Sequence, residues 1–580
     1  MKFSTLADYF ARIESTSKRL EMTDILAELF RGVPAADSEI DKIVYLCQGQ
    51  LQASFDNVEF GMSEKLLRRS LAQAVGSTDA DINALFQRCG DYGLVIEQAS
   101  RRQGGGLTVT AVYDALREIA AVSGSGSVQR KISLVGSLLG NLSGGEAKYV
   151  VRVILGRLRL GVGDPTVLDA LSLAAAADKS LRPSLERAYN LCSDLGRVAR
   201  ILFEEGIEPV RNFQVIVGCP IRVALAARLN SPEDIIEKIG TCAVEYKYDG
   251  FRCQIHKDGG NIRIFSRNLE DMTAMFPELR AAAVEQIGCR RAIFEGEAVA
   301  FDPHTGKTQP FQVTVQRKRK HDIAAMQRDF PLQLYAFDLL YTEPEGDITE
   351  RTYEQRRDIL SRIVAGGRTI QLSPFIEVSD AGRLQEIFED AVSRGYEGIV
   401  VKRPDSTYRA GGRNFNWIKL KRSYSGNLND TIDCAVVGFY FGKGSRTAAG
   451  IGSLLVCVYD ERDGRYKTVA KVGSGFSEAE MKALRGLFAD IQTHAQPKDV
   501  DSVLVPDVWV QPRYVVAVQA DEITRSPVHT CAKDSENAPG LALRFPRMAG
   551  FPRADKQARD ATTVEEIRQM FSSQGRLKAA

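Results

Sequence analysis

The sequence predicts a multidomain α+β protein with an all-helical region, a mixed α/β region and an all-β region, in that order. Its 580 residues exceed one ordinary domain and suggest three or four. Apolar residues recur at three- and four-residue spacing up to about residue 213, and short alternating or β-branched runs take over from about residue 215. A polar stretch after residue 422 has linker composition and precedes a last group of strands.

The first region, residues 1–213, reads as helices joined by short loops. The helical spacing is clearest in KYVVRVILGRLRLGVGDPTVLDALSLAAAA, residues 148–177. Glycine- and serine-rich breaks at 104–106 and 123–127 are typical of loops between helices. The N-terminus, MKFSTLADYFARIE, mixes charged and apolar residues and predicts an amphipathic helix rather than a signal peptide.

The second region, residues 214–422, reads as strands mixed with helices. FRCQIHKDGGNIRIFSR predicts a β-hairpin with its turn at 258–260. Four further strands are predicted: RRAIFEGEAVAF, LQLYAFDLLY, EGIVVK and NWIKLK.

The third region, residues 423–580, begins with the polar segment SYSGNLND and continues as strands. The predicted strands are IDCAVVGFY, GSLLVCVYD, YKTVAKVGSGF, VWVQPRYVVAVQAD and LALRFPRM. Short strands at this spacing indicate a small β-barrel.

Composition excludes several classes of protein. With 44% apolar and 26% charged residues the chain is typical of a globular protein and not of a disordered one. No apolar run approaches the about 18 residues that cross a bilayer, so we expect a cytosolic protein. Ten cysteines without a CxxC pair and five histidines indicate neither a zinc site nor a disulfide framework. The net charge of +2 means that any nucleic-acid surface must come from local clusters of Lys and Arg.

The stretch EYKYDGFR, residues 245–252, places a lysine two residues before an aspartate and a glycine. K-x-D-G alone is weak evidence, since it arises by chance in roughly one chain of this length in several. Here it is followed by an ordered series of charged motifs: SRN (266–268), FEGE ending at Glu297, YAFDLLY (335–341), EGIVVK (397–402), WIKLK (417–421) and RFPRMAGFPRADK (544–556). Six motifs in a fixed order indicate one site.

The residue types in this series suit attack on a nucleoside triphosphate. A lysine amine attacks phosphorus only when deprotonated, and nearby cations or desolvation favour that form. Lys419 and Lys421 alternate on a predicted strand, so both point to one face and can grip a phosphate. Glu297 and Glu397 are hard oxygen ligands of the kind that Mg²⁺ prefers. Lys247 is the predicted nucleophile.

Together these motifs resemble the covalent nucleotidyltransferases, and more narrowly the ATP-dependent DNA ligases of archaeal and eukaryotic replication. The resemblance covers nearly the whole chain and implies a helical DNA-binding domain (1–213), an adenylation domain (214–422) and an OB-fold domain (423–580). The FPR…RADK ending is the most discriminating motif. The chain has no G-x-x-x-x-G-K-[ST] motif, so a P-loop nucleotide-binding site is not indicated.

The resemblance implies a role for each motif residue, with ATP as substrate and Mg²⁺ or another divalent metal as cofactor. Lys247 would become lysyl-AMP, and Glu245 would contact the adenine through the neighbouring backbone or its side chain. Phe337 would stack on the purine. Glu297 would contact either the ribose hydroxyl or a metal, and Glu397 would help to bind metal. The remaining implied contacts are Arg252 and Arg267 to ribose or phosphate, Arg413, Lys419 and Lys421 to phosphate, and Arg547, Arg553, Asp555 and Lys556 to the departing pyrophosphate.

For three of these residues a purely structural role is an alternative to the functional one. Phe337 lies in a strongly apolar strand and could be ordinary core. Glu297 could pair with an arginine, and Arg413 lies in the loop RAGGRNFN, where a solvated arginine is equally ordinary.

Nicked double-stranded DNA is the partner that the resemblance implies. Gly161, Gly163 and Asp164 precede a predicted helix whose N-terminal amides could hold a DNA phosphate, or they form an ordinary turn. The run QRKRKH (316–321) is either a phosphate-binding edge or a solvated surface. A sliding clamp is a further partner in this family, but the segment near Gln103 lacks the paired aromatics of a clamp-binding peptide.

Rival interpretations are other enzymes or a binding protein. RNA ligases and mRNA-capping guanylyltransferases lack the long helical region and the FPR…RADK ending. An NAD-dependent DNA ligase would carry a cysteine-rich zinc module. A non-catalytic DNA-binding protein would not be expected to keep Lys247, Glu297, Glu397, Lys419 and Lys421. We expect a monomer without membrane association, cytoplasmic and nucleoid-associated if archaeal, acting in DNA replication, repair and recombination.

Overall fold

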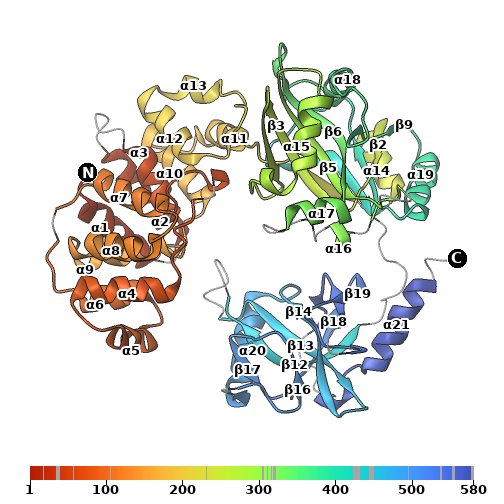
Figure 1. The fold of residues 1–580 in the computed structure, drawn as a ribbon. Helices are drawn as coiled ribbons and strands as arrows, with labels where there is room; N and C mark the ends of the chain where they lie inside the picture. The colour runs from red at the N-terminus through yellow and green to blue at the C-terminus, as the bar shows by residue number, and fades with distance from the viewer. Residues whose placement is uncertain are drawn as a thin grey trace. The chain divides into compact units, whose positions relative to one another are not determined.

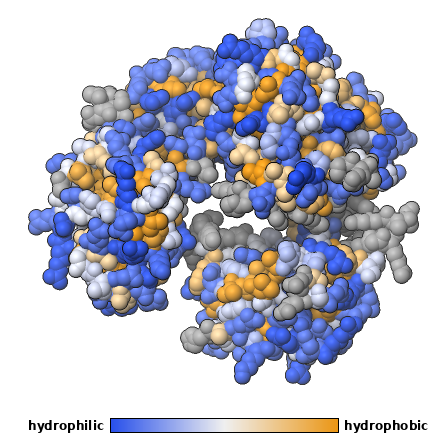
Figure 2. All heavy atoms as spheres, in the orientation of Figure 1, coloured by the Kyte–Doolittle hydropathy of each residue, from blue (hydrophilic) through white to orange (hydrophobic). Residues whose placement is uncertain are grey.

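The computed structural model divides the chain into two compact units, Met1–Lys421 and Arg422–Ala580, each described here by itself (Figure 1). It describes all residues except 17, 34–38, 57, 105, 230, 303–305, 310, 315–316, 318–321, 422–430, 443–449, 494, 536–537, 551–555 and 577–580. Within this described part, no helix combines the length and the apolar character that a membrane span needs. The face drawn in Figure 2 is mostly hydrophilic, with apolar residues in scattered groups.

The first unit begins with helices only, as predicted. In α1 the residues Phe3, Leu6, Phe10 and Ile13 are buried at helical spacing. Ser143 and Glu146 form a capping box that starts α9. The helices are α1 (Phe3–Glu14), α2 (Arg19–Arg31), α3 (Ile40–Cys47), α4 (Glu64–Val75), α5 (Asp79–Cys89), α6 (Tyr92–Ala99), α7 (Val109–Ala121), α8 (Ser127–Gly140), α9 (Gly144–Ile154), α10 (Asp164–Ala176), α11 (Arg182–Cys192), α12 (Leu195–Glu204) and α13 (Ile207–Arg211).

The rest of the first unit contains two sheets. One has the strand order β1-β11-β10-β2-β9, and the other has the order β4-β3-β5-β6-β7 with β8 beside β6. The strands are β1 (Leu225–Arg228), β2 (Cys242–Tyr246), β3 (Phe251–Asp258), β4 (Asn261–Ser266), β5 (Arg291–Ala300), β6 (Leu332–Thr342), β7 (Gly346–Asp347), β8 (Ile370–Leu372), β9 (Phe375–Val378), β10 (Gly398–Lys402) and β11 (Arg413–Lys421). The predicted hairpin is confirmed, because β3 and β4 pair antiparallel up to Asp258 and Asn261.

Helices cover these sheets through apolar cores. Side chains of α14 and α19 pack with one face of the first sheet, including Val244, Ile399 and Ile418. Side chains of α15 and α18 pack with the second sheet. The helices of this part are α14 (Pro232–Ile239), α15 (Pro277–Gln286), α16 (Phe311–Thr314), α17 (Ile323–Asp329), α18 (Tyr353–Ile363) and α19 (Ala381–Ser393).

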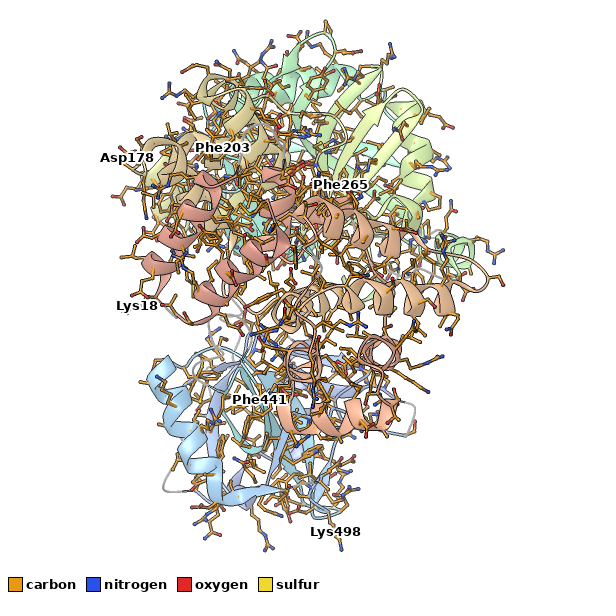
Figure 3. The ribbon with its side chains drawn as sticks, turned by 90° about the vertical axis from the view of Figure 1, so that its left-hand side faces the viewer. Lys18, Asp178, Phe203, Phe265, Phe441 and Lys498 are labelled. Atoms are coloured by element: carbon orange, nitrogen blue, oxygen red, sulfur yellow. The ribbon has the colours of Figure 1, made fainter. Side chains whose placement is uncertain are left out.

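The helical part and the sheets also contact each other directly. Phe265 of β4, labelled in Figure 3, is fully buried and meets the ring of Phe55 edge-on at 6.1 Å. Arg263 pairs with Asp56 across the same contact at 3.4 Å. Both are long-range contacts within the first unit, so the two parts share an interface there.

The second unit is rich in strands, as predicted, but it is not all-β. Its strands are β12 (Ile432–Tyr440), β13 (Ser453–Asp460), β14 (Arg465–Val472), β15 (Gln492–Thr493), β16 (Val500–Asp501), β17 (Val508–Val510), β18 (Val515–Gln519), β19 (Glu522–Ser526), β20 (Gly540–Arg544) and β21 (Arg547–Met548). It also contains α20 (Glu478–Phe488) and α21 (Val564–Arg576). We did not predict α20, although Ser477 and Glu480 form its capping box and Met481, Leu484 and Phe488 are buried at helical spacing. The predicted linker SYSGNLND lies outside the described residues.

Candidate active site

Lys247 follows β2, and its main chain is hydrogen-bonded to Glu397 and Gly398 at the start of β10. Its amide donates to the carbonyl oxygen of Gly398 at 2.9 Å, and its own carbonyl accepts from the Glu397 amide at 3.0 Å. Gly398 has φ of 141° and approaches the Leu420 carbonyl of β11 so closely that a Cβ would collide with it. The glycine therefore allows three segments to meet at the lysine.

Glu397 sits between two lysines. Its Oε2 accepts from Lys247 Nζ and its Oε1 from Lys421 Nζ. Burial alone would raise the pKa of Glu397, but the two lysines outweigh it and lower that pKa. Both carboxylate oxygens are thus taken up by ion pairs.

Lys419 lies two residues before Lys421 on β11, on the same face, as the alternation predicted. Burial lowers the pKa of Lys419, and Lys421, Arg413, Lys247 and Arg267 lower it further through their charges. Five of the predicted residues therefore share one cationic region, which suits a polyanion.

Glu297 lies on β5, opposite Arg252 of β3. Burial raises the pKa of Glu297 to about 7, against the opposing influence of Lys247 and Arg252. No side-chain ion pair joins Glu297 to either cation among the described residues, so the plainer reading of Glu297 as an arginine partner is not favoured. Arg252 instead pairs with the buried Glu295 at 2.7 Å.

Phe337 and Glu245 are buried together with Lys402 and Tyr353, two residues that the sequence analysis did not predict to be part of the site. Phe337 is 9% exposed, and Lys402 Nζ lies 4.6 Å from its ring centroid. Lys402 donates to both oxygens of Glu245 at 3.0 Å, and Tyr353 donates its hydroxyl to Glu245 Oε1. Burial lowers the pKa of Lys402, and Glu245 opposes that shift. Lys402 is the last residue of the EGIVVK motif. A lysine at the end of an apolar strand was the sequence signal that could have indicated a buried ion pair with a carboxylate.

The described residues contain no cluster of three or more His, Cys, Asp or Glu side chains able to hold a metal ion. Mg²⁺, however, commonly takes one or two carboxylates and completes its shell with water and substrate phosphates. Glu297, a carboxylate beside the cationic region, fits that pattern. Glu397 fits it less well while both of its oxygens contact lysines.

The C-terminal motif lies in the second unit, and Arg553 and Asp555 are outside the described residues. Arg547 is 45% exposed and pairs with Asp521 at 3.0 Å. Lys556 pairs with Asp433.

The Asp164 side chain is hydrogen-bonded within the helical part and to Arg222. Its carboxylate accepts from Gln48 at 3.0 Å, Tyr189 at 2.6 Å and Arg222 at 2.7 Å. The amide of Thr166 donates to the Gly163 carbonyl. These bonds fix the Asp164 side chain at the start of α10, and the phosphate site formed by the backbone amides stays a prediction.

In the run 316–321 only Arg317 is described. Its side chain is fully buried and pairs with Glu278. Both predicted alternatives for this run, a phosphate-binding edge or a solvated surface, are therefore wrong for Arg317, because its guanidinium packs inward beside the Phe276 ring.

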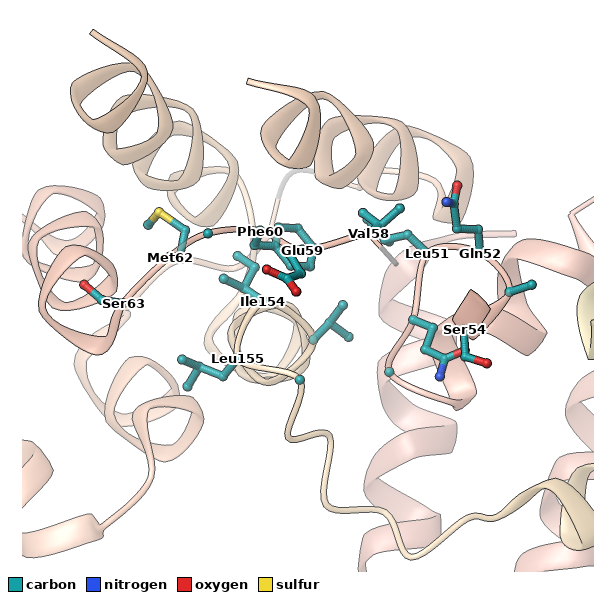
Figure 4. Close-up of a pocket in the computed structure, with 16 residues that line it drawn as sticks. Leu51, Gln52, Ser54, Val58, Glu59, Phe60, Met62, Ser63, Ile154 and Leu155 are labelled. Carbon is teal, nitrogen blue, oxygen red and sulfur yellow. The ribbon is translucent and has the colours of Figure 1, made fainter. Parts of the chain in front are cut away.

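The helical part has a pocket of its own, of about 570 Å³, between residues 49–63 and the C-terminal end of α9 (Figure 4). Phe60 and Glu59 lie beside Ile154 and Leu155 in this view. None of the predicted site residues lines it.

Comparison with known proteins identifies relatives over the whole chain. Three family models match: the DNA ligase N terminus at residues 2–172, the ATP dependent DNA ligase domain at 223–421 and the ATP dependent DNA ligase C terminal region at 447–556. A "Probable DNA ligase" of Dictyoglomus turgidum is 50% identical over 578 residues, covering 100% of this chain and 99% of that protein. "DNA ligase 2" of Thermofilum pendens is 42% identical over 593 residues, covering 99% and 98%. A solved structure titled "Pmar-Lig_PreS3" has a similar fold, with a TM-score of 0.54 at 17% identity over 94% of this chain and 99% of that one.

Proposed function

The chain belongs to the ATP-dependent DNA ligases, and from that premise we propose how its own residues carry out the reaction. Its activity is the sealing of nicks in DNA with ATP. The proposed path has three steps: Lys247 takes AMP from ATP, the 5′-phosphate at the nick takes AMP from Lys247, and the 3′-hydroxyl then displaces AMP. Strand joining of a nicked duplex, assayed with ATP, GTP or NAD in turn, tests this assignment, and joining with ATP is the expected result.

The observation that carries the proposal is the Lys247–Glu397–Lys421 arrangement. Backbone bonds to Gly398 and Glu397 fix the Lys247 main chain, and the Glu397 carboxylate holds its Nζ. In the first step the deprotonated Nζ bonds to the α-phosphorus while the bond to the β-phosphate breaks and pyrophosphate leaves. The triphosphate would replace Glu397 as the main partner of Lys421.

Lys419, Lys421, Arg413 and Arg267 are the proposed phosphate contacts. The positive charges of Lys421, Arg413 and Arg267 all act on Lys419, so the region favours an anion. Charge that develops on the α-phosphate in the transition state would be stabilised by these fixed cations.

Glu297 is the proposed metal ligand, with Glu397 joining once phosphate draws the lysines away. Mg²⁺ bound there would neutralise charge on the phosphates. Burial raises the pKa of Glu297, and a divalent cation bound beside it would oppose that shift.

Phe337 is the proposed stacking surface for the purine, with Glu245 and Arg252 holding it in place. Glu245 anchors Lys402 under the ring, and the Arg252 guanidinium lies 5.4 Å from the Phe337 centroid. Since the Glu245 side chain is buried against Lys402 and Tyr353, its contact to adenine would run through the neighbouring backbone.

Arg547, with Lys556 and the undescribed Arg553 and Asp555, is proposed to act on pyrophosphate in the first step only. We expect Arg547→Ala to slow self-adenylation roughly 100-fold, because removing one charge-stabilising donor has effects of that order. Sealing of a pre-adenylated nick should stay within about tenfold. Single-turnover gels on the two substrates measure the difference, and equal losses in both steps would refute a role in pyrophosphate release.

The proposed domains are residues 1–213 for DNA binding, 214–422 for adenylation and 423–580 as an OB-fold. We expect a fragment of residues 1–213 to bind duplex DNA without sequence preference. Its affinity should fall about tenfold or more between 50 and 200 mM salt, because contacts to phosphates release counterions. Fluorescence anisotropy with the folded fragment measures this. If residues 214–580 bind DNA as tightly as the whole chain and the fragment binds none, the domain assignment fails.

Further proposals concern the cell. We propose a monomer that works on nicked double-stranded DNA during replication, repair, recombination and cell division, in the cytoplasm and associated with the nucleoid if the source is archaeal. Any sliding clamp would be bound through residues other than those near Gln103.

A further inference from the structure

A second cavity lies in the first unit, away from the phosphate-binding lysines. It has a volume of about 800 Å³, within the usual range for sites that take drug-sized molecules. One face of α18, strands β2 and β9 and the segment after β10 form its walls. Neither Lys247 nor Glu297, Glu397, Lys419 or Lys421 lines it.

A buried layer separates this cavity from the candidate active site. Ala243 lines the cavity and lies on the same face of β2 as Glu245, two residues away. Tyr353 also lines the cavity, and its hydroxyl bonds to Glu245, which in turn pairs with Lys402. The cavity therefore adjoins the proposed adenine pocket through Tyr353 and Glu245, but none of the proposed nucleophile, metal-binding or phosphate-binding residues lines it.

The inner part of the cavity is cationic. Arg357 is 7% exposed, and its guanidinium donates to two carbonyl oxygens, Ala336 at 2.9 Å and Ser373. Within the described residues Arg357 forms no ion pair with a carboxylate. A buried guanidinium whose hydrogen bonds go only to neutral carbonyl oxygens favours a nearby anion.

An aromatic side chain stands beside this cation. Phe375 is 45% exposed, and the Arg357 guanidinium lies 5.5 Å from its ring centroid. Register places Phe375 opposite Glu245, so it stands on the cavity side of β9. Its open ring surface is suited to stacking with another planar molecule.

The outer part of the cavity carries more negative than positive charge. Glu354, Asp358, Glu377 and Asp405 line it and are exposed, and one cation, Arg403, lies 3.9 Å from Asp405 in the same lining. These carboxylates would repel a polyanion such as a triphosphate or a DNA strand at the entrance. We propose that the cavity is a second binding site, for a small planar aromatic molecule with one anionic group, which stacks on Phe375 and directs its anion to Arg357.

The probe for this site is 8-anilinonaphthalene-1-sulfonate, a planar aromatic monoanion, titrated by fluorescence into the folded full-length chain. We expect saturable binding of one molecule per chain that persists in saturating ATP. Phe375→Ala should weaken binding about tenfold or more, since it removes the stacking surface. N-phenyl-1-naphthylamine, which lacks the sulfonate, should bind at least about tenfold more weakly because it cannot pair with Arg357.

The matched control is Phe441→Ala, which removes another exposed phenylalanine, from the second unit, and should leave binding within about twofold. Circular dichroism confirms that both variants are folded. Displacement of the probe by ATP would place it in the nucleotide site and overturn the proposal. Equal affinity in wild type and Phe375→Ala, or equal affinity for the charged and neutral probes, would overturn it as well.

Discussion

Lys247→Ala is expected to abolish sealing of an ordinary nick with ATP and to retain sealing of a nick whose 5′ end already carries AMP. The lysine is covalently required only for the first two steps. We expect a loss of roughly 10⁴-fold or more on the ordinary nick. Sealing of the pre-adenylated nick should slow by about ten- to a hundredfold, because Glu397 loses one of its two lysine partners. Gel-based strand joining with one enzyme preparation on both substrates measures the two effects.

Lys238→Ala is the matched control, since it removes an exposed lysine at the end of α14 whose ammonium lies 4.6 Å from the ring centroid of Phe415. It should seal both substrates like the unaltered chain. Joining of the ordinary nick by the Lys247 variant would remove Lys247 from the nucleophile role. Failure of the folded variant on both substrates would mean that the lysine also acts in the last step.

Glu245→Gln is expected to destabilise the first unit by about 3–5 kcal/mol. Glu245 is 4% exposed and Lys402 is 1% exposed, so the substitution leaves a buried ammonium without its counter-ion. Chemical denaturation measures the loss of free energy of unfolding. Glu386→Gln is the control, because its ion pair with Arg383 is solvent-exposed and should contribute less than about 1 kcal/mol.

The cost of Glu245→Gln should depend on pH. Burial lowers the pKa of Lys402, and removal of Glu245 lowers it further. Below that lowered pKa the folded variant keeps Lys402 charged, and the loss of free energy of unfolding is largest. As the pH rises towards the ordinary pKa of lysine, Lys402 of the folded variant releases its proton, and the loss of free energy of unfolding becomes smaller. A cost that does not change with pH would contradict the buried-charge explanation.

The order of the charged motifs made much of the site predictable. Lys419 and Lys421 alternate on a strand, and one alternation rule was enough to put both on the face that meets Lys247. The helical, mixed and strand-rich regions followed from the period of their apolar residues. These are local properties, which a sequence displays directly.

The buried polar partners could not be predicted, because they depend on contacts between distant segments. Lys402 and Glu245 are 157 residues apart in the sequence. The sequence left Asp164 in either a phosphate-binding turn or an ordinary turn, and its partner Arg222, 58 residues further on, could be predicted from neither. Arg317 belongs to a basic run in the sequence, yet its guanidinium packs inward beside the Phe276 ring, 39 residues from its ion-pair partner Glu278.

The most direct measurement is the covalent labelling of the unaltered chain. The protein is incubated with Mg²⁺ and α-labelled ATP, α-labelled GTP or adenylate-labelled NAD, then digested, and the labelled peptide is identified by mass spectrometry. We expect label from ATP alone, on the peptide that contains Lys247, through a bond that acid cleaves and alkali does not, as is typical of a phosphoramidate. Label on another residue, or no label from ATP, would contradict this expectation.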